Sequence, residues 1–164
     1  MILGLFSLSA YTTLHVVISL VAIATGLVVI AGILTGKRLD NWTFWFLLTT
    51  VLTNLTGFGF PFERLLPSHI FGIISLVALL LAIVGRYAFN MQGHWRWLYV
   101  FTAMLALWLN VFVLVVQSFM KVGFLNALAP TQAEPPFLVA QLVVLAVFVV
   151  MGIVGLRKFR PVAV

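Results

Sequence analysis

Long apolar runs without a charged residue constrain this chain more than any other feature. No charged residue precedes Lys37, and none lies between His69 and Arg86. Each run is long enough for a helix to cross the hydrocarbon core of a bilayer, which takes about 20 residues. In lipid every backbone polar group needs a partner within the protein, so a spanning segment is either a helix or part of a closed barrel. The runs lack the polar–apolar alternation of barrel strands, so they predict membrane-spanning helices.

The composition excludes several other protein classes. Of 164 residues, 64% are hydrophobic and 7% are charged, and the mean hydropathy of +1.25 excludes an ordinary soluble domain. The net charge of +6 comes from basic residues at the ends of the apolar runs, a pattern typical of membrane orientation and not of nucleic-acid binding. The absence of cysteine excludes disulfides, thiolate metal sites and covalently attached haem. The N-terminus lacks the basic segment of a cleaved signal peptide, so we expect it to lead into the first span.

The apolar runs and the residues that interrupt them predict one all-α domain over residues 1–164. Pro67 and Ser68 predict the start of a helix, because proline fits the first turn and serine can cap free N–H groups. Prolines in residues 129–136 exclude a continuous helix there, and residues 122–136 are expected to be non-helical. The five predicted spans cover about residues 11–35, 42–60, 68–89, 97–120 and 137–156.

The basic residues predict how the five spans are oriented. Arg64 and Lys121 would lie on one side of the membrane, and all other basic residues on the opposite side. Because lysine and arginine accumulate in cytoplasmic loops, we expect the N-terminus outside and the C-terminus inside, in a bacterial cytoplasmic (inner) membrane. The residues expected on the cytoplasmic side are Lys37, Arg38, Arg86, Arg96, Arg157, Lys158 and Arg160.

Each predicted span contributes a polar side chain to one layer in the outer half of the membrane. With a rise of about 1.5 Å per residue, His15 and His69 come to similar depths in the first and third spans. Ionisable residues at such positions are functional candidates. Further polar side chains expected near this pair are Asn54, Asn110, Gln117, Gln141, Glu63 and Glu134.

Small residues beneath the two histidines predict space for a flat group. His15, Ser19 and Gly26 share one face of the first helix, and Gly72 lies one turn below His69. A porphyrin between two helices needs an imidazole from each side and no bulky side chain in its plane. We therefore expect His15 and His69 to bind haem b for electron transfer, with a quinone or a periplasmic protein as redox partner.

Other interpretations of the same residues stay open. His15 and His69 could instead bind a single iron, copper or zinc ion together with Glu63 or Glu134. The small residues could serve only helix packing, in a non-catalytic accessory or assembly subunit of a membrane complex that binds no cofactor. Asn54, Asn110 and Gln117 could bind a small lipophilic molecule.

Three short motifs carry a resemblance to known proteins. They are Gly-Phe-Gly-Phe-Pro at 57–61, Ser-His at 68–69, and Ala-Pro-Thr-Gln-Ala-Glu-Pro-Pro-Phe at 129–137. Together with the first-span histidine, this order is similar to that of small bacterial integral membrane proteins of unknown function. The resemblance implies a bacterial inner-membrane protein and no particular activity. Likeness to helical-bundle b-type cytochromes is an analogy of fold, and this chain has one histidine pair where the best-known bundles have two.

Overall fold

The computed structural model describes residues 7–60 and 67–160. These residues form helices joined by short connections, and they contain no strand. The all-α prediction is therefore confirmed for the described part of the chain. The elements in chain order are α1 (Leu8–Leu34), α2 (Asp40–Phe58), α3 (Pro67–Ile83), a π-helical turn η1 (Val84–Ala88), α4 (His94–Lys121), α5 (Gly123–Leu128) and α6 (Pro135–Lys158).

Four helical stretches within the described residues are long and apolar enough to cross a membrane. They are Leu8–Leu34, His69–Ala88, His94–Lys121 and Pro135–Lys158. By length and composition, these helices fit a multi-pass membrane protein. The second predicted span does form a helix, α2, but it is not among the four because Asp40 and a run of threonines and asparagine make its 19 residues more polar.

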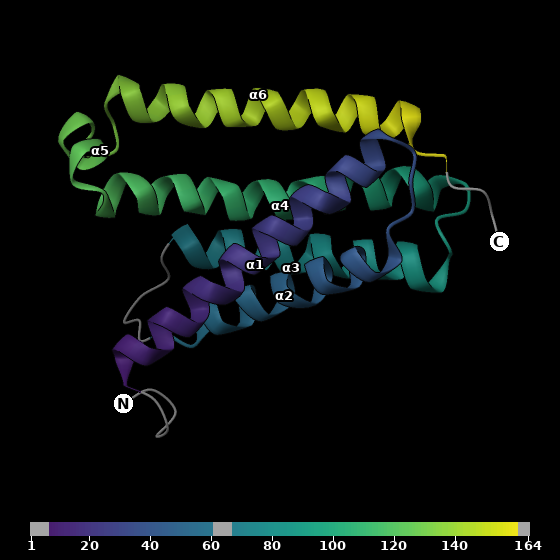
Figure 1. The fold of residues 1–164 in the computed structure, drawn as a ribbon, viewed down its shortest axis with the longest axis horizontal. Coiled ribbons are helices and arrows are strands. Elements are labelled where there is room, and N and C mark those ends of the chain that lie inside the picture. Colours follow the sequence, from purple (N-terminus) through teal and green to yellow (C-terminus); the bar gives the residue numbers. More distant parts are fainter. Residues whose placement is uncertain (1–6, 61–66, 161–164) are drawn as a thin grey trace.

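The long helices run up and down, so that helix ends distant in sequence meet at two ends of the bundle (Figure 1). At the end that holds most basic residues, Arg96 Nη1 donates to the backbone oxygens of Leu156 (3.0 Å) and Phe159 (2.7 Å), which joins the start of α4 to the end of α6. In Figure 1, α6 lies alongside α4, and α1 crosses the other helices obliquely. Much of α6 is exposed and apolar, as lipid contact requires.

The structure differs from the sequence prediction at two connections. Residues 122–136, expected to be non-helical, contain the short helix α5. Residues 122–129 hold no proline, and Asn126 Nδ2 donates to the backbone oxygen of Phe119 (3.2 Å). The fourth helix begins at His94, earlier than the predicted residue 97, directly after Gly93 with its positive φ of 52°. Glycine adopts this conformation without the steric cost that other residues meet.

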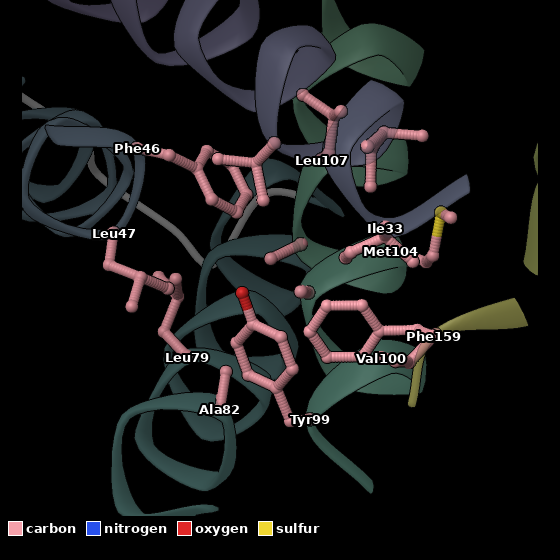
Figure 2. Close-up of a cluster of buried hydrophobic side chains, with 14 of the residues drawn as sticks. Ile33, Phe46, Leu47, Leu79, Ala82, Tyr99, Val100, Met104, Leu107 and Phe159 are labelled. Atoms are coloured by element: carbon pink, nitrogen blue, oxygen red, sulfur yellow. The ribbon is translucent and has the colours of Figure 1, made fainter. Parts of the chain in front are cut away.

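The larger cluster of buried apolar side chains among the described residues includes Met91, Tyr99 and Phe159, from the basic end of the bundle. Figure 2 shows part of this cluster. Phe46 of α2 and Leu107 of α4 are fully buried there. A Cβ added to Gly26 of α1 would come within 2.6 Å of Leu107 and 2.9 Å of Phe46, so glycine lets the three helices approach closely.

A buried arginine lies at the basic end of the bundle, beside Tyr99 of this core. Arg86 in η1 is 1% exposed, and its guanidinium pairs with the carboxylate of Asp40 at the start of α2. Its Nη1 also lies 3.4 Å from the hydroxyl oxygen of Tyr99. Asp40 accepts a second hydrogen bond from Arg38 Nε (2.8 Å). A buried charge without its partner is costly, so Asp40 holds η1 and the start of α2 together.

We predict that Asp40→Asn destabilises the protein by about 2 kcal/mol, because it leaves the Arg86 charge buried without a carboxylate. The Asp40 side chain is itself 63% exposed, and solvent screening therefore reduces the loss. The free energy of unfolding in mixed micelles, followed by circular dichroism, measures this. Arg38→Gln is the matched control and should cost under about 1 kcal/mol, since it removes only the exposed pair. Equal losses for the two variants would contradict the prediction.

Candidate functional site

A cavity of about 590 Å³ lies among α1, α2, α3 and α4. Its walls are the N-terminal halves of α1 and α3 and the C-terminal halves of α2 and α4, toward the end of the bundle away from Arg86. Most of the lining is apolar. The polar side chains in the lining are Thr12, His15, Ser19, Thr53, Asn54, His69, Ser75, Asn110, Gln117, Ser118 and Lys121.

The structure brings most of the predicted site residues to this one cavity. Those that line it are His15, His69, Ser19, Gly72, Asn54, Asn110 and Gln117. Gly26 lies in the packed core, and Gln141 and Glu134 are also outside the cavity lining. Glu63 lies outside the described residues.

His15 is oriented by Thr56 of α2. Its Nδ1 lies 2.7 Å from the Thr56 hydroxyl oxygen, and that hydroxyl donates its proton to the backbone oxygen of Leu52 (2.7 Å). A hydroxyl has one proton, so when Thr56 donates to Leu52 it accepts from His15, and in this tautomer Nδ1 carries the hydrogen. Nε2 of neutral His15 then holds the free lone pair. Tyr11, one turn earlier, donates to the backbone oxygen of Thr56 (2.8 Å), so two side chains of α1 hold the same residue.

Aromatic rings from the end of α2 flank both histidines. The Phe60 ring meets the His15 ring edge-on, with centroids 5.2 Å apart. The Phe58 ring lies 5.7 Å from the ring of His69, which is 6% exposed. A Cβ on Gly72 would come within 3.0 Å of Phe58. The space expected beneath His69 for a flat cofactor is thus partly filled by Phe58, as the space at Gly26 is filled by Phe46 and Leu107.

Two buried hydrogen-bond donors in the cavity wall lack a partner among the described residues. They are the hydroxyl of Thr53, a residue 9% exposed, and Nδ2 of Asn110. Buried polar groups nearly always have a partner, so each such group calls for an explanation. Thr50, one turn before Thr53, has the usual arrangement, because its hydroxyl donates to the backbone oxygen of Phe46 (2.6 Å).

Sequence reasoning did not single out Thr53. Threonines of an apolar helix commonly donate to their own backbone, and Thr49 and Thr50 do so. Thr53 lies one turn after Thr49 on the same helix, but its hydroxyl has no partner among the described residues. No signal in the sequence separates it from its neighbours.

Among the described residues, the side chains that line the cavity are either neutral or positively charged. Lys121, at the end of α4, is exposed and carries the one permanent charge in that lining. No carboxylate belongs to it, and no three His, Cys, Asp or Glu side chains of the described residues come together as a metal site would require. Asn54 is satisfied within the protein, since it donates to Ser75 Oγ (3.0 Å) and to the backbone oxygen of Thr50 (2.8 Å).

Glu134 and Gln141 have structural partners. The Glu134 carboxylate accepts hydrogen bonds from the Thr131 hydroxyl (2.8 Å) and from the backbone N–H groups of Thr131 (3.2 Å) and Ala133 (3.1 Å). Slight desolvation opposes these bonds, but together they lower the pKa of Glu134 below its usual value. Gln141 donates to the backbone oxygen of Phe112 (3.2 Å), which ties α6 to α4.

We predict that the neutral His15 ring carries its proton on Nδ1. Nitrogen NMR of ¹⁵N-histidine-labelled protein, recorded well above the ordinary histidine pKa, should show a protonated Nδ1 and an unprotonated Nε2. Thr56→Val should abolish this preference, and Thr49→Val, which removes a hydroxyl outside the cavity, should preserve it. A proton on Nε2 in the unmodified protein would contradict the assignment.

We predict that the backbone amide resonances of Thr131 and Ala133 titrate together, with a midpoint below the usual glutamate pKa of 4.5. The lowered pKa means that the ionised carboxylate stabilises this turn above the unfolded-state pKa, and that the stabilisation disappears as pH falls through the folded-state value. Solution NMR between pH 7 and pH 3 measures the midpoint. In Glu134→Gln the shared titration should vanish.

Comparisons with known proteins do not supply a function for this cavity. The chain matches no protein-family model, no curated protein and no solved structure. The chemistry of the cavity therefore has to be inferred from its own side chains.

Proposed function

We propose that this protein binds a small lipophilic molecule with hydrogen-bond-accepting oxygen atoms in the cavity among α1, α2, α3 and α4. The observation that carries the proposal is the pair of unpartnered buried donors, Thr53 and Asn110, in an otherwise mostly apolar wall. A buried donor left without an acceptor costs about 1–3 kcal/mol, and a ligand oxygen would remove that cost.

The size and lining of the cavity support a ligand of this class. Its volume of about 590 Å³ falls within the range of about 300–1,000 Å³ that is usual for small-molecule sites. Such sites combine an apolar lining with a few polar groups that orient the ligand. His15 and Gln117 add further polar groups to the same lining.

The membrane setting follows from charge and helix order. In the proposed arrangement α2 also crosses the bilayer, which makes five spans, with the N-terminus outside a bacterial inner membrane. The basic end of the bundle then faces the cytoplasm, as basic residues generally do. The cavity lies in the outer half, where a lipophilic molecule can enter from the lipid.

The test compares ligand retention in variants of nearly unchanged shape. Thr53→Val and Asn110→Leu each remove one donor and should each weaken retention of the co-purified lipophile by about fivefold, as the loss of one hydrogen bond implies. Mass spectrometry of solvent extracts from purified protein quantifies the lipophile. Thr50→Val and Gln141→Leu are matched controls, since they remove a hydroxyl and an amide outside the cavity. Equal retention by all four variants would overturn the proposal.

A second candidate is ligation of haem b or of a single metal ion by His15 and His69. The observation that favours it is the free lone pair on Nε2 of His15, which is the form of imidazole that ligates metals. Haem would supply electron-transfer chemistry, while His15 and His69 would hold it. Phe58 against Gly72 argues for a smaller ligand. An absorption spectrum of the purified protein, oxidised and reduced, separates this candidate from the first: haem gives a Soret band, and a lipophile without a metal does not.

A further inference from the structure

The hydrogen-bonding pattern of the cavity narrows the ligand to one chemical class. Building on the proposed function, we infer that the ligand is a lipophilic quinone, bound in both its oxidised and its reduced form. The inference uses the donors of Thr53 and Asn110, which have no partner among the described residues, together with Nε2 of His15, an acceptor in the tautomer predicted above; all three residues line one cavity.

Thr53 and Asn110 match the oxidised form. A quinone carries carbonyl oxygens on a flat apolar ring, and each carbonyl accepts hydrogen bonds but donates none. The Thr53 hydroxyl and the Asn110 amide are donors for which the described part of the chain offers no acceptor. Among the described lining residues there is no carboxylate to compete for these donors.

His15 matches the reduced form. Because Thr56 occupies Nδ1–H, neutral His15 presents Nε2 as a hydrogen-bond acceptor. A quinone has no proton to give to this nitrogen, but a quinol hydroxyl does. The site thus offers donors for the carbonyl oxygens of a quinone and an acceptor for a hydroxyl of the corresponding quinol.

The apolar part of the lining suits a flat ring with a hydrocarbon tail. Phe58, Phe60 and Phe71 supply aromatic faces and edges, against which a quinone ring can pack. Ile23 and Val113 extend the apolar surface. A fatty acid fits this lining less well. Its carboxylate would pair with Lys121 at the end of α4, and its hydrocarbon tail would offer no acceptor to Thr53 and Asn110.

The experiment measures binding of decylubiquinone and of its pre-reduced quinol to the detergent-purified protein by isothermal titration calorimetry. Thr53→Val should weaken quinone binding about fivefold, and Thr53→Ser, which restores the hydroxyl, should recover it. His15→Leu should weaken quinol binding at least fivefold more than quinone binding. Thr50→Val, with an unchanged cavity, should bind both forms as the unmodified protein does. Size-exclusion chromatography verifies that each variant is folded.

The outcomes separate this inference from the proposed function. If decylubiquinone and its quinol fail to bind, while retention of another lipophile depends on Thr53 and Asn110, the quinone assignment is overturned and the proposed function stands. If no lipophile depends on these residues, both are overturned. Equal binding of quinone and quinol by every variant would indicate partition into the detergent shell and would also overturn the quinone assignment.

Discussion

The structure depends on one constraint, which is that a polar side chain inside an apolar bundle must find its hydrogen-bond partner within the protein. Many of the described threonines meet it locally, as Thr25 and Thr50 do by donating to the preceding turn of their own helices. Asn54 meets it between helices, through Ser75 of α3. The terminal nitrogens of Arg86 meet it through Asp40 and Tyr99, while its Nε has no partner among the described residues. Five buried side-chain atoms of the described residues have no hydrogen-bond partner, and two of them, the Thr53 hydroxyl and the Asn110 amide nitrogen, belong to residues that line the cavity.

The helices pack closely toward one end of the bundle and leave a cavity toward the other. Toward the basic end, Gly26 lets Phe46 and Leu107 fill the space between α1, α2 and α4, so the helices are held close together. Toward the other end, Tyr11 and His15 hold α1 to Thr56 by hydrogen bonds, and a partly open cavity lies among the helices. A packed half can fix the geometry of a hollow half, because the same continuous helices run through both.

Depth along the helices was predictable, whereas the direction of a side chain around its helix was not. A constant rise per residue and an up-and-down chain bring His15, His69, Asn54 and Asn110 to a common layer, and the structure does bring them to one cavity. Gln141 lies at a similar depth by the same reasoning, but its amide is used to tie α6 to α4. The apolar residues around it on α6 carry too weak a periodic pattern to say which side of that helix faces the protein.

The sequence by itself determined that this chain is a helical multi-pass membrane protein, because long uncharged apolar runs have few other ways to satisfy their backbone. It also determined which polar residues are available for chemistry. The tertiary structure alone decided which of them meet. It assigned Gly26 to packing and Glu134 to a turn, and it left the Thr53 hydroxyl without an acceptor among the described residues. The physical reason is that hydrogen bonding and close packing depend on how helices turn and cross, and a nearly uniform apolar sequence scarcely encodes that rotation in its local pattern.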